Sequence, residues 1–363
     1  MGHNLYSVIA ATGSYIPTRK VANRDFLNRD FLDQHGNPFD KENEEIIDKF
    51  RQITGIEERR YVKDDLLTSD IASLAARDAL DSSGIDKETL DYVIVAHNFG
   101  DLRPDNRRTD QLPSIASKVK HSLEIENPNT IPYDVPFGCP GWLQGMIQAD
   151  YYIRSGDVKR ALIIGAETLS RIYDPYDRDS MIYSDGAGAA ILEARESETP
   201  VGILSHKTRS DTLDQAYLLR MGASFRSNGE SDQDLYMKMD GHKLYQYALR
   251  NVPGVVKESL DKAECSLDDI QKVFIHQANA KMDQAILKRI FKLYERNNVP
   301  DNIMPMTISW LGNSSVATIP TLLDLVIKEK MEDHTVKNGD HVIFASVGAG
   351  MNINSMVYRF PED

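Results

Sequence analysis

Residues 80–95 read LDSSGIDKETLDYVIV, and residues 260–275 read LDKAECSLDDIQKVFI. In both segments a helix end is followed by a polar turn and then by a short apolar run typical of a strand. The two segments align without a gap at an offset of 180 residues. A repeated unit of this length predicts that the chain contains two similar halves.

Two further pairs of segments follow in the same order. Residues 161–165 (ALIIG) and 341–345 (HVIFA) are apolar runs that each follow a Gly-Asp turn, again 180 residues apart. Residues 137–139 (FGC) match residues 311–313 (LGN) at a slightly shorter offset. Continuous apolar runs that alternate with helices are typical of sheets covered on both faces. We therefore predict an α/β protein with two halves, residues 1–196 and 197–363, and a site where they meet.

Composition and charge narrow the function classes. The chain has 363 residues and a formal net charge of −13, which disfavours binding to nucleic acid and to anionic membranes. Its two cysteines are too few for a disulfide framework or a cysteine zinc site. No apolar run is long enough to span a membrane. We expect a cytoplasmic protein without a metal, nucleotide or flavin cofactor.

Cys139 is the candidate nucleophile. It lies in DVPFGCPGW (134–142), where an apolar approach ends at Gly138 and a segment with helical spacing begins at Trp142. Unpaired amides and the helix dipole at such a turn favour a thiolate. The other cysteine, Cys265, lies in a loop, and we expect it to be inert.

Two polar residues complete a candidate acyl-transfer set. His276 ends the apolar strand 273–275, and Asn313 stands in the second half where Cys139 stands in the first. If the halves are related by a twofold axis, Cys139 and Asn313 begin two neighbouring central helices, although Asn313 would also serve as an ordinary N-cap. A Cys–His–Asn set indicates thiolate acyl transfer, but it does not separate a hydrolase from an enzyme that forms carbon–carbon bonds.

The ordered motifs resemble the β-ketoacyl-acyl-carrier-protein synthase III family of the thiolase superfamily over nearly the whole chain. The resemblance rests on TGIEER (54–59), the Gly138-Cys139 turn, DPYDR (174–178), DGAGAA (185–190), HQAN (276–279), GNSS (312–315) and GAG (348–350). It implies a thiolase-like, five-layered αβαβα fold made of two similar halves, usually in a homodimer.

The same resemblance implies roles for individual residues. Cys139 would be acylated, and the backbone N–H groups of Cys139 and Ala349 would form an oxyanion hole. His276 and Asn313 would hold the thioester oxygen of a malonyl-type donor during decarboxylation. Further substrate-binding positions would be Trp142, Arg178, Leu112, Asn279, Gly348 and Gly350, with Leu112 contributed by the dimer partner.

The substrates implied are acyl-coenzyme A or acyl-carrier-protein thioesters. Lys49 and Ile53 stand where primer-type members carry a coenzyme-A-binding Trp and Arg, which favours a donor borne on a carrier protein. The acidic acyl carrier protein would dock on a basic stripe, and Lys281, Lys288 and Arg289 match the docking positions of the family. The polar stretch 98–111 is longer than in primer-type members, and it is interpreted as a loop that lines the site, contacts the partner or faces solvent.

Two other activities, and the possibility of an inactive protein, are alternatives at this stage. A secondary-metabolic ketosynthase could join two acyl chains, as in dialkylresorcinol-type or head-to-head condensation. A cysteine thioesterase would use the same residues with water as the acceptor. A catalytically inactive scaffold would not need Cys139, His276 and Asn313 together.

Overall fold

The computed structural model describes residues 4–226 and 234–362 and contains two main sheets. The first sheet has the order β1-β9-β8-β4-β7, and its strands are Asn4–Tyr15, Asp185–Ser197, Arg160–Thr168, Tyr92–Ala96 and Ile131–Val135. The second has the order β10-β15-β14-β13, with strands Gly202–Ser210, Asn352–Arg359, His341–Gly348 and Ile270–Ile275. The predicted boundary after residue 196 falls at the end of β9.

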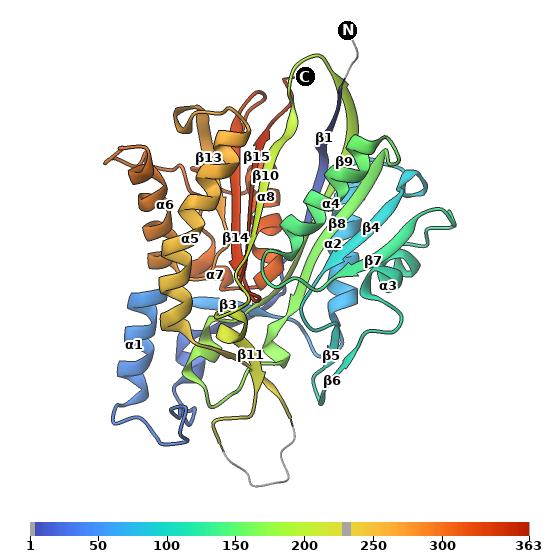
Figure 1. Cartoon of the computed structure of the whole chain (residues 1–363). Coiled ribbons are helices and arrows are strands. Elements are labelled where there is room, and N and C mark those ends of the chain that lie inside the picture. Colours follow the sequence, from blue (N-terminus) through green and yellow to red (C-terminus); the bar gives the residue numbers. More distant parts are fainter. Residues whose placement is uncertain (1–3, 227–233, 363) are drawn as a thin grey trace.

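Helices form three layers around these sheets (Figure 1). Helices α4 (Gly141–Ser155) and α8 (Thr318–Ile327) share one buried cluster with side chains of both sheets, so they form the central layer. Helices α2 (Thr68–Ser83) and α3 (Ile115–Ser122) cover the outer face of the first sheet. Helices α5 (Gly241–Lys262) and α6 (Ala280–Leu293) cover the second. The five-layered αβαβα fold predicted from the resemblance is confirmed.

The sequence repeat corresponds to equivalent strand pairs. β4 pairs in parallel with β8, and β13 pairs in parallel with β14. In each half the strand after this pair runs antiparallel to it, β9 beside β8 and β15 beside β14. The matched segments 92–95 and 272–275 therefore occupy the same place in their sheets, because alternating apolar runs and helices dictate the same crossover twice.

The two matched Gly turns lie in the segments that lead into the central helices α4 and α8. Gly138 and Gly312 have φ angles of 70° and 65°, which are left-handed values that favour glycine. Cys139 precedes α4 by two residues. Asn313 follows the short helix α7 (Ile308–Leu311) and is separated from α8 by the 3-10 turn η7 (Ser315–Ala317). Asn313 therefore does not begin α8 directly, and in this respect the repeat is imperfect.

Smaller elements form the lower part of the molecule in Figure 1. Helix α1 (Asn43–Thr54) packs there with the 3-10 turn η1 (Asn23–Phe26) and the antiparallel pair of β2 (Arg19–Ala22) and β3 (Glu58–Tyr61). A second antiparallel pair consists of β11 (Leu219–Gly222) and β12 (Tyr236–Met239). Among the described residues, no helix combines the length and apolarity that crossing a membrane requires.

The polar stretch 98–111 is more ordered than the loop that its sequence predicts. Strands β5 (Asp101–Arg103) and β6 (Asn106–Asp110) form an antiparallel hairpin. Asp101 is buried, and its carboxylate accepts hydrogen bonds from the backbone and hydroxyl of Ser69 and from Lys118. The interpretation of Asp101 as a solvated loop residue is therefore wrong, because these three donors compensate for its burial.

Candidate active site

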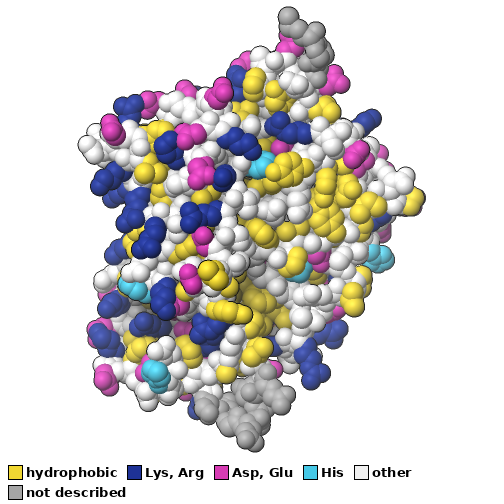
Figure 2. Space-filling model, in the orientation of Figure 1, with side chains coloured by type: hydrophobic (Ala, Val, Ile, Leu, Met, Phe, Trp, Pro, Cys, Tyr) yellow, Lys and Arg dark blue, Asp and Glu magenta, His cyan; other side chains and the backbone are white. Residues whose placement is uncertain are grey.

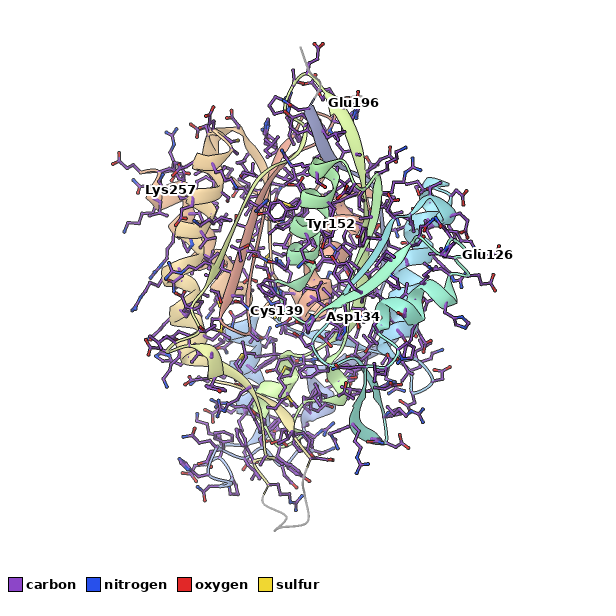
Figure 3. The ribbon with its side chains drawn as sticks, turned by 45° about the vertical axis from the view of Figure 1, so that its right-hand side comes forward. Glu126, Asp134, Cys139, Tyr152, Glu196 and Lys257 are labelled. Carbon is purple, nitrogen blue, oxygen red and sulfur yellow. The ribbon has the colours of Figure 1, made fainter. Side chains whose placement is uncertain are left out.

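Cys139 lies in the turn between β7 and α4, near the middle of the molecule (Figure 3). The Ser315 hydroxyl lies 3.2 Å from its sulfur and donates to it. Burial raises the pKa of the thiol to about 11, and the negative charge of Glu167 also raises it, while the Ser315 hydrogen bond lowers it. The prediction that the helix start favours a thiolate is corrected here, since desolvation of the charged form outweighs the favourable contacts.

Asn313 lies beside this thiol and faces a cavity. Its Oδ1 atom accepts a hydrogen bond of 2.8 Å from the backbone N–H of Ser315, the residue whose hydroxyl contacts Cys139. Asn313 also lines a cavity of about 630 Å³. The Oδ1 atom therefore caps the turn, as expected of an N-cap, and the role of Asn313 in substrate binding stays a prediction.

His276 follows the last residue of β13 and is buried. Its backbone N–H donates to Ala345 in the neighbouring strand, and its Nδ1 lies 2.7 Å from the hydroxyl of Thr318. Burial lowers the pKa of the imidazole to about 4. His276 is therefore neutral near pH 7, so it offers the site a neutral ring nitrogen and not a cation.

One short segment brings the three predicted residues together. Residues 313–318 contact Cys139 through Ser315 and His276 through Thr318, and they contain Asn313 itself. The Thr318 hydroxyl also lies 3.0 Å from the carbonyl of Ser315, which closes the turn. The segment therefore links Cys139 of the first half to His276 of the second half and contains Asn313.

The turn after β14 packs directly on the nucleophile turn. A Cβ atom added to Gly348 would lie 2.6 Å from the Cys139 nitrogen, and one added to Gly138 would lie 2.8 Å from the Ala349 nitrogen. Side chains at these two positions would push the turns apart. The glycines therefore allow close packing of the two turns that carry the backbone amides of Cys139 and Ala349, the predicted oxyanion-hole donors.

The cavity leads from Asn313 to the surface between α1 and α5. Asn279 lines it and also caps α6 by accepting a hydrogen bond from Met282. Arg178 lies at the same cavity, with its guanidinium 4.9 Å from the centre of the Phe39 ring. The remaining lining residues include Lys49, Phe50, Ile53, Met181 and Leu244. Apolar walls with a few polar groups suit an acyl chain on an extended polar arm.

Four of the six predicted substrate-binding residues lie outside the cavity lining, namely Trp142, Leu112, Gly348 and Gly350. Trp142 is buried in the core between the sheets, where its indole N–H donates to Ile163. This differs from the prediction that Trp142 shapes the acyl pocket, because the first turn of α4 directs its side chain into the central layer. Leu112 is 89% exposed and does not line the cavity of its own chain.

The remaining predicted positions lie in turns and on the outer helix layer. Gly350, with a φ of 133°, is in the turn between β14 and β15. Lys281, Lys288 and Arg289 are exposed on α6, and Arg289 also donates to the carbonyl of Leu249 on α5. Cys265 is partly buried in the loop after α5.

Sequence reasoning missed four polar residues of the site. Ser315 and Thr318 contact Cys139 and His276 directly. Asn98 and Glu167 lie behind Ser315. The side-chain amide of Asn98 donates one hydrogen bond to Glu167 and one to the Ser315 hydroxyl. A signal was present, because Asn98 and Glu167 stand at the carboxyl ends of the apolar strands β4 and β8, where sites of parallel sheets are built. In the two described stretches no cluster of His, Cys, Asp and Glu is arranged to hold a metal ion.

Comparison with known proteins shows the family and the fold of the chain. The model of 3-oxoacyl-[acyl-carrier-protein] synthase III matches residues 133–212, and the model of its C-terminal part matches residues 260–360. The synthase III structure from Thermus thermophilus is 29% identical, with a TM-score of 0.79 over 98% of this chain and 100% of that chain. The one from Aquifex aeolicus VF5 is 28% identical, with a TM-score of 0.78 over the same shares.

A more distant similarity shows the fold alone. The priming β-ketosynthase of the R1128 polyketide pathway is 24% identical, with a TM-score of 0.80 over 99% of this chain and 98% of that chain.

Proposed function

Because the chain belongs to the 3-oxoacyl-[acyl-carrier-protein] synthase III family, we propose that it condenses an acyl group with a malonyl-type thioester carried by acyl carrier protein. The observation that carries this proposal is the segment 313–318, which contacts Cys139 through Ser315 and His276 through Thr318, and whose Asn313 lines a largely apolar cavity. The reaction belongs to fatty-acid biosynthesis or a related pathway.

The first step transfers the acyl group to Cys139. The sulfur attacks the thioester carbonyl, and the carrier thiol leaves with the proton that Cys139 gave up. The tetrahedral oxyanion lies against the backbone amides of Cys139 and Ala349, in the two turns that the glycines allow to pack closely. No metal or cofactor is needed in this step.

The second step generates the carbon nucleophile. The malonyl group loses CO₂, and the electron pair of the broken bond moves onto the thioester oxygen as an enolate. The Nε2–H of His276 and the Nδ2–H of Asn313 donate to that oxygen. The enolate carbon then attacks the acyl group, and the bond between the acyl carbon and the Cys139 sulfur breaks. A neutral His276 suits this role, because it donates without requiring an acidic solution.

A donor on a carrier protein fits the cavity mouth better than coenzyme A. Lys49 and Ile53 line the mouth, and the Ile53 side chain offers no hydrogen bond to a nucleotide. The guanidinium of Arg178 is stacked on Phe39. The Lys and Arg side chains gather over α5 and α6 (Figure 2), which suits an acidic partner. We therefore propose Lys281, Lys288 and Arg289 as docking residues.

We also propose that the chain works as a homodimer. Strand β7 is an edge strand of the first sheet, and its Ile131 is exposed. Tyr151 on α4 is exposed as well, and hydrophobic side chains gather over this side of the molecule (Figure 2). An exposed apolar area beside an open strand edge is typical of an interface. Leu112, which does not line the cavity of its own chain, would then reach the site of the partner subunit.

The test is intact-protein mass spectrometry of the wild type and of Cys139→Ala. Each is incubated with the same acyl chains on coenzyme A and on acyl carrier protein, with and without malonyl-carrier protein. We expect an adduct on Cys139 that forms faster from the carrier protein and is discharged by the malonyl partner. An adduct that decays in water alone would identify a hydrolase, and the absence of any adduct would contradict acyl transfer.

Asn313→Asp separates the two steps. The carboxylate keeps the Oδ1 cap of Ser315 but repels the enolate oxygen. We expect Cys139 to be acylated as before, while release of CO₂ falls by about a hundredfold. Release of CO₂ from malonyl-carrier protein is measured directly. Loss of acylation together with decarboxylation would refute the roles assigned to Asn313.

A further inference from the structure

Behind the thiol of Cys139 lies a chain of polar side chains from three separate elements. Glu167 stands near the end of β8, and Asn98 follows the end of β4, the neighbouring parallel strand. Oε2 of Glu167 accepts hydrogen bonds from the backbone N–H and from the Nδ2 of Asn98. The Nδ2 of Asn98 lies 3.0 Å from the Ser315 hydroxyl, which lies 3.2 Å from the Cys139 sulfur.

The direction of each hydrogen bond in this chain follows from its chemistry. An amide nitrogen only donates, so Nδ2 of Asn98 gives one proton to Glu167 and the other to the oxygen of Ser315. The Ser315 oxygen is therefore an acceptor on the side of Asn98, and its own proton points to the sulfur. A hydroxyl held in this way stabilises a thiolate more than a freely rotating one.

The backbone of Ser315 carries an independent sign of constraint. Its φ angle is 53°, in the left-handed region that non-glycine residues seldom adopt. The side chain of Asn313 holds this conformation by capping the Ser315 N–H. Strained residues of this kind persist where the surrounding structure requires them, and they cluster at functional sites.

We propose that Glu167, Asn98 and Ser315 are positioning residues that direct the Ser315 hydroxyl proton at the Cys139 sulfur and so increase its reactivity. Glu167 fixes the orientation of the Asn98 amide, and that amide fixes the orientation of the Ser315 hydroxyl. The hydroxyl in turn donates to the sulfur of Cys139. The proposal rests on the assignment of Cys139 as the acylated residue, but its test uses alkylation of the thiol and needs no substrate.

Hydrogen bonds help to accommodate the buried carboxyl group of Glu167. Burial raises the pKa of Glu167 to about 7 and the nearby Asp185 raises it further, while the two hydrogen bonds from Asn98 lower it. The ionised carboxylate of Glu167 disfavours the thiolate by repulsion, so its contribution has to come through Asn98.

The test measures the rate at which iodoacetamide alkylates Cys139, by mass spectrometry of the Cys139 and Cys265 peptides from the same sample. We expect Ser315→Ala to slow alkylation of Cys139 roughly three- to tenfold at about pH 8, because the thiol pKa rises. The pH–rate profile should shift upward accordingly. Ser315→Gly deletes the same hydroxyl with a residue that suits the positive φ, so the result does not depend on strain.

A double-mutant cycle tests the link through Asn98. Asn98→Leu removes both side-chain donations, and we expect slower alkylation in the wild-type background but no further change in the Ser315→Ala background. An equal effect of Asn98→Leu in both backgrounds would overturn the proposal, and so would an unchanged rate in Ser315→Ala and Ser315→Gly.

A charge-matched pair tests Glu167. Both Glu167→Gln and Glu167→Leu remove the charge, but only glutamine still accepts the two Asn98 hydrogen bonds. We expect faster alkylation in Glu167→Gln than in Glu167→Leu, and equal rates would remove Glu167 from the network. Ser314→Ala deletes the neighbouring hydroxyl and should leave the alkylation rate of Cys139 unchanged. The alkylation rate of Cys265 should be the same in every variant.

Discussion

At the scale of single residues, Thr318 decides which nitrogen of His276 carries the proton. Its hydroxyl has one proton and two acceptors within reach, Nδ1 of His276 at 2.7 Å and the carbonyl of Ser315 at 3.0 Å. If the proton goes to Nδ1, the neutral ring presents Nε2–H to the substrate. If it goes to Ser315, Nδ1 becomes the donor and Nε2 becomes a base. The proposed decarboxylation requires the first arrangement, in which Thr318 donates to His276 in place of the hydrogen bond to the Ser315 carbonyl that the structure shows.

Thr318→Val tests this dependence with a side chain of the same shape. We expect decarboxylation of malonyl-carrier protein to slow by about tenfold, because the Nε2–H tautomer loses its partner. Acylation of Cys139 should continue, and Thr318→Ser should restore decarboxylation. Since the pKa of His276 is about 4, protonation of the ring should not appear in the rate profile above about pH 6. A valine variant with the wild-type rate would contradict this role of Thr318.

At the scale of elements, α6 combines a structural face with a basic exposed face. Asn279 caps its first turn, and Met282, Ile286 and Ile290 are buried against the second half of the molecule. Lys281 and Lys288 are exposed on the opposite side, seven residues apart and therefore on one face of the helix. Arg289 is different, because its bond to Leu249 also ties α6 to α5.

The double substitution Lys281→Glu and Lys288→Glu tests docking. Two reversed charges oppose an acidic carrier, so we expect KM for the malonyl-carrier protein to rise about tenfold or more. Acylation from a small soluble thioester should be unchanged. Lys330→Glu together with Lys337→Glu, on two exposed residues beyond α8, is the matched control. An equal loss with both donors would indicate damage to α6 and not to docking.

At the scale of the whole molecule, the site exists because two similar halves face each other across α4 and α8. Cys139, the proposed nucleophile, comes from the first half, and His276, Asn313 and Ala349 come from the second. Each half brings a Gly turn to the middle of the molecule, and the buried cluster around Trp142 and Phe344 holds the two sheets on the central helices. Neither half alone contains the full set of groups.

The assembly of two chains is tested by sedimentation equilibrium. We expect the wild type to be a dimer and the variant with Ile131→Glu and Tyr151→Glu to be a monomer, because charges on a buried apolar interface remain unpaired. Circular dichroism should show that the variant is folded. Tyr217→Glu changes a residue that is 80% exposed away from β7, and it should leave the dimer intact. A monomeric wild type would refute the proposed dimer.

The sequence alone determined the duplicated α/β architecture and the positions of Cys139, His276 and Asn313. These features depend on local patterns, namely apolar runs, glycine turns and residues at strand ends. Such patterns involve residues that are close together in the sequence, and they can therefore be recognised without the structure. The hairpin at 101–110 was missed because its polar residues, such as Asp101, are stabilised by partners from other elements.

Only the tertiary structure decided how the site is tuned. The thiol pKa is raised by burial, which depends on what covers Cys139 and not on the helix start beside it. Asn98 and Ser315 are 217 residues apart in the chain, and the direction of their hydrogen bond depends on a third residue, Glu167. Desolvation and hydrogen-bond direction are properties of packed neighbours, and the chain order does not encode them locally.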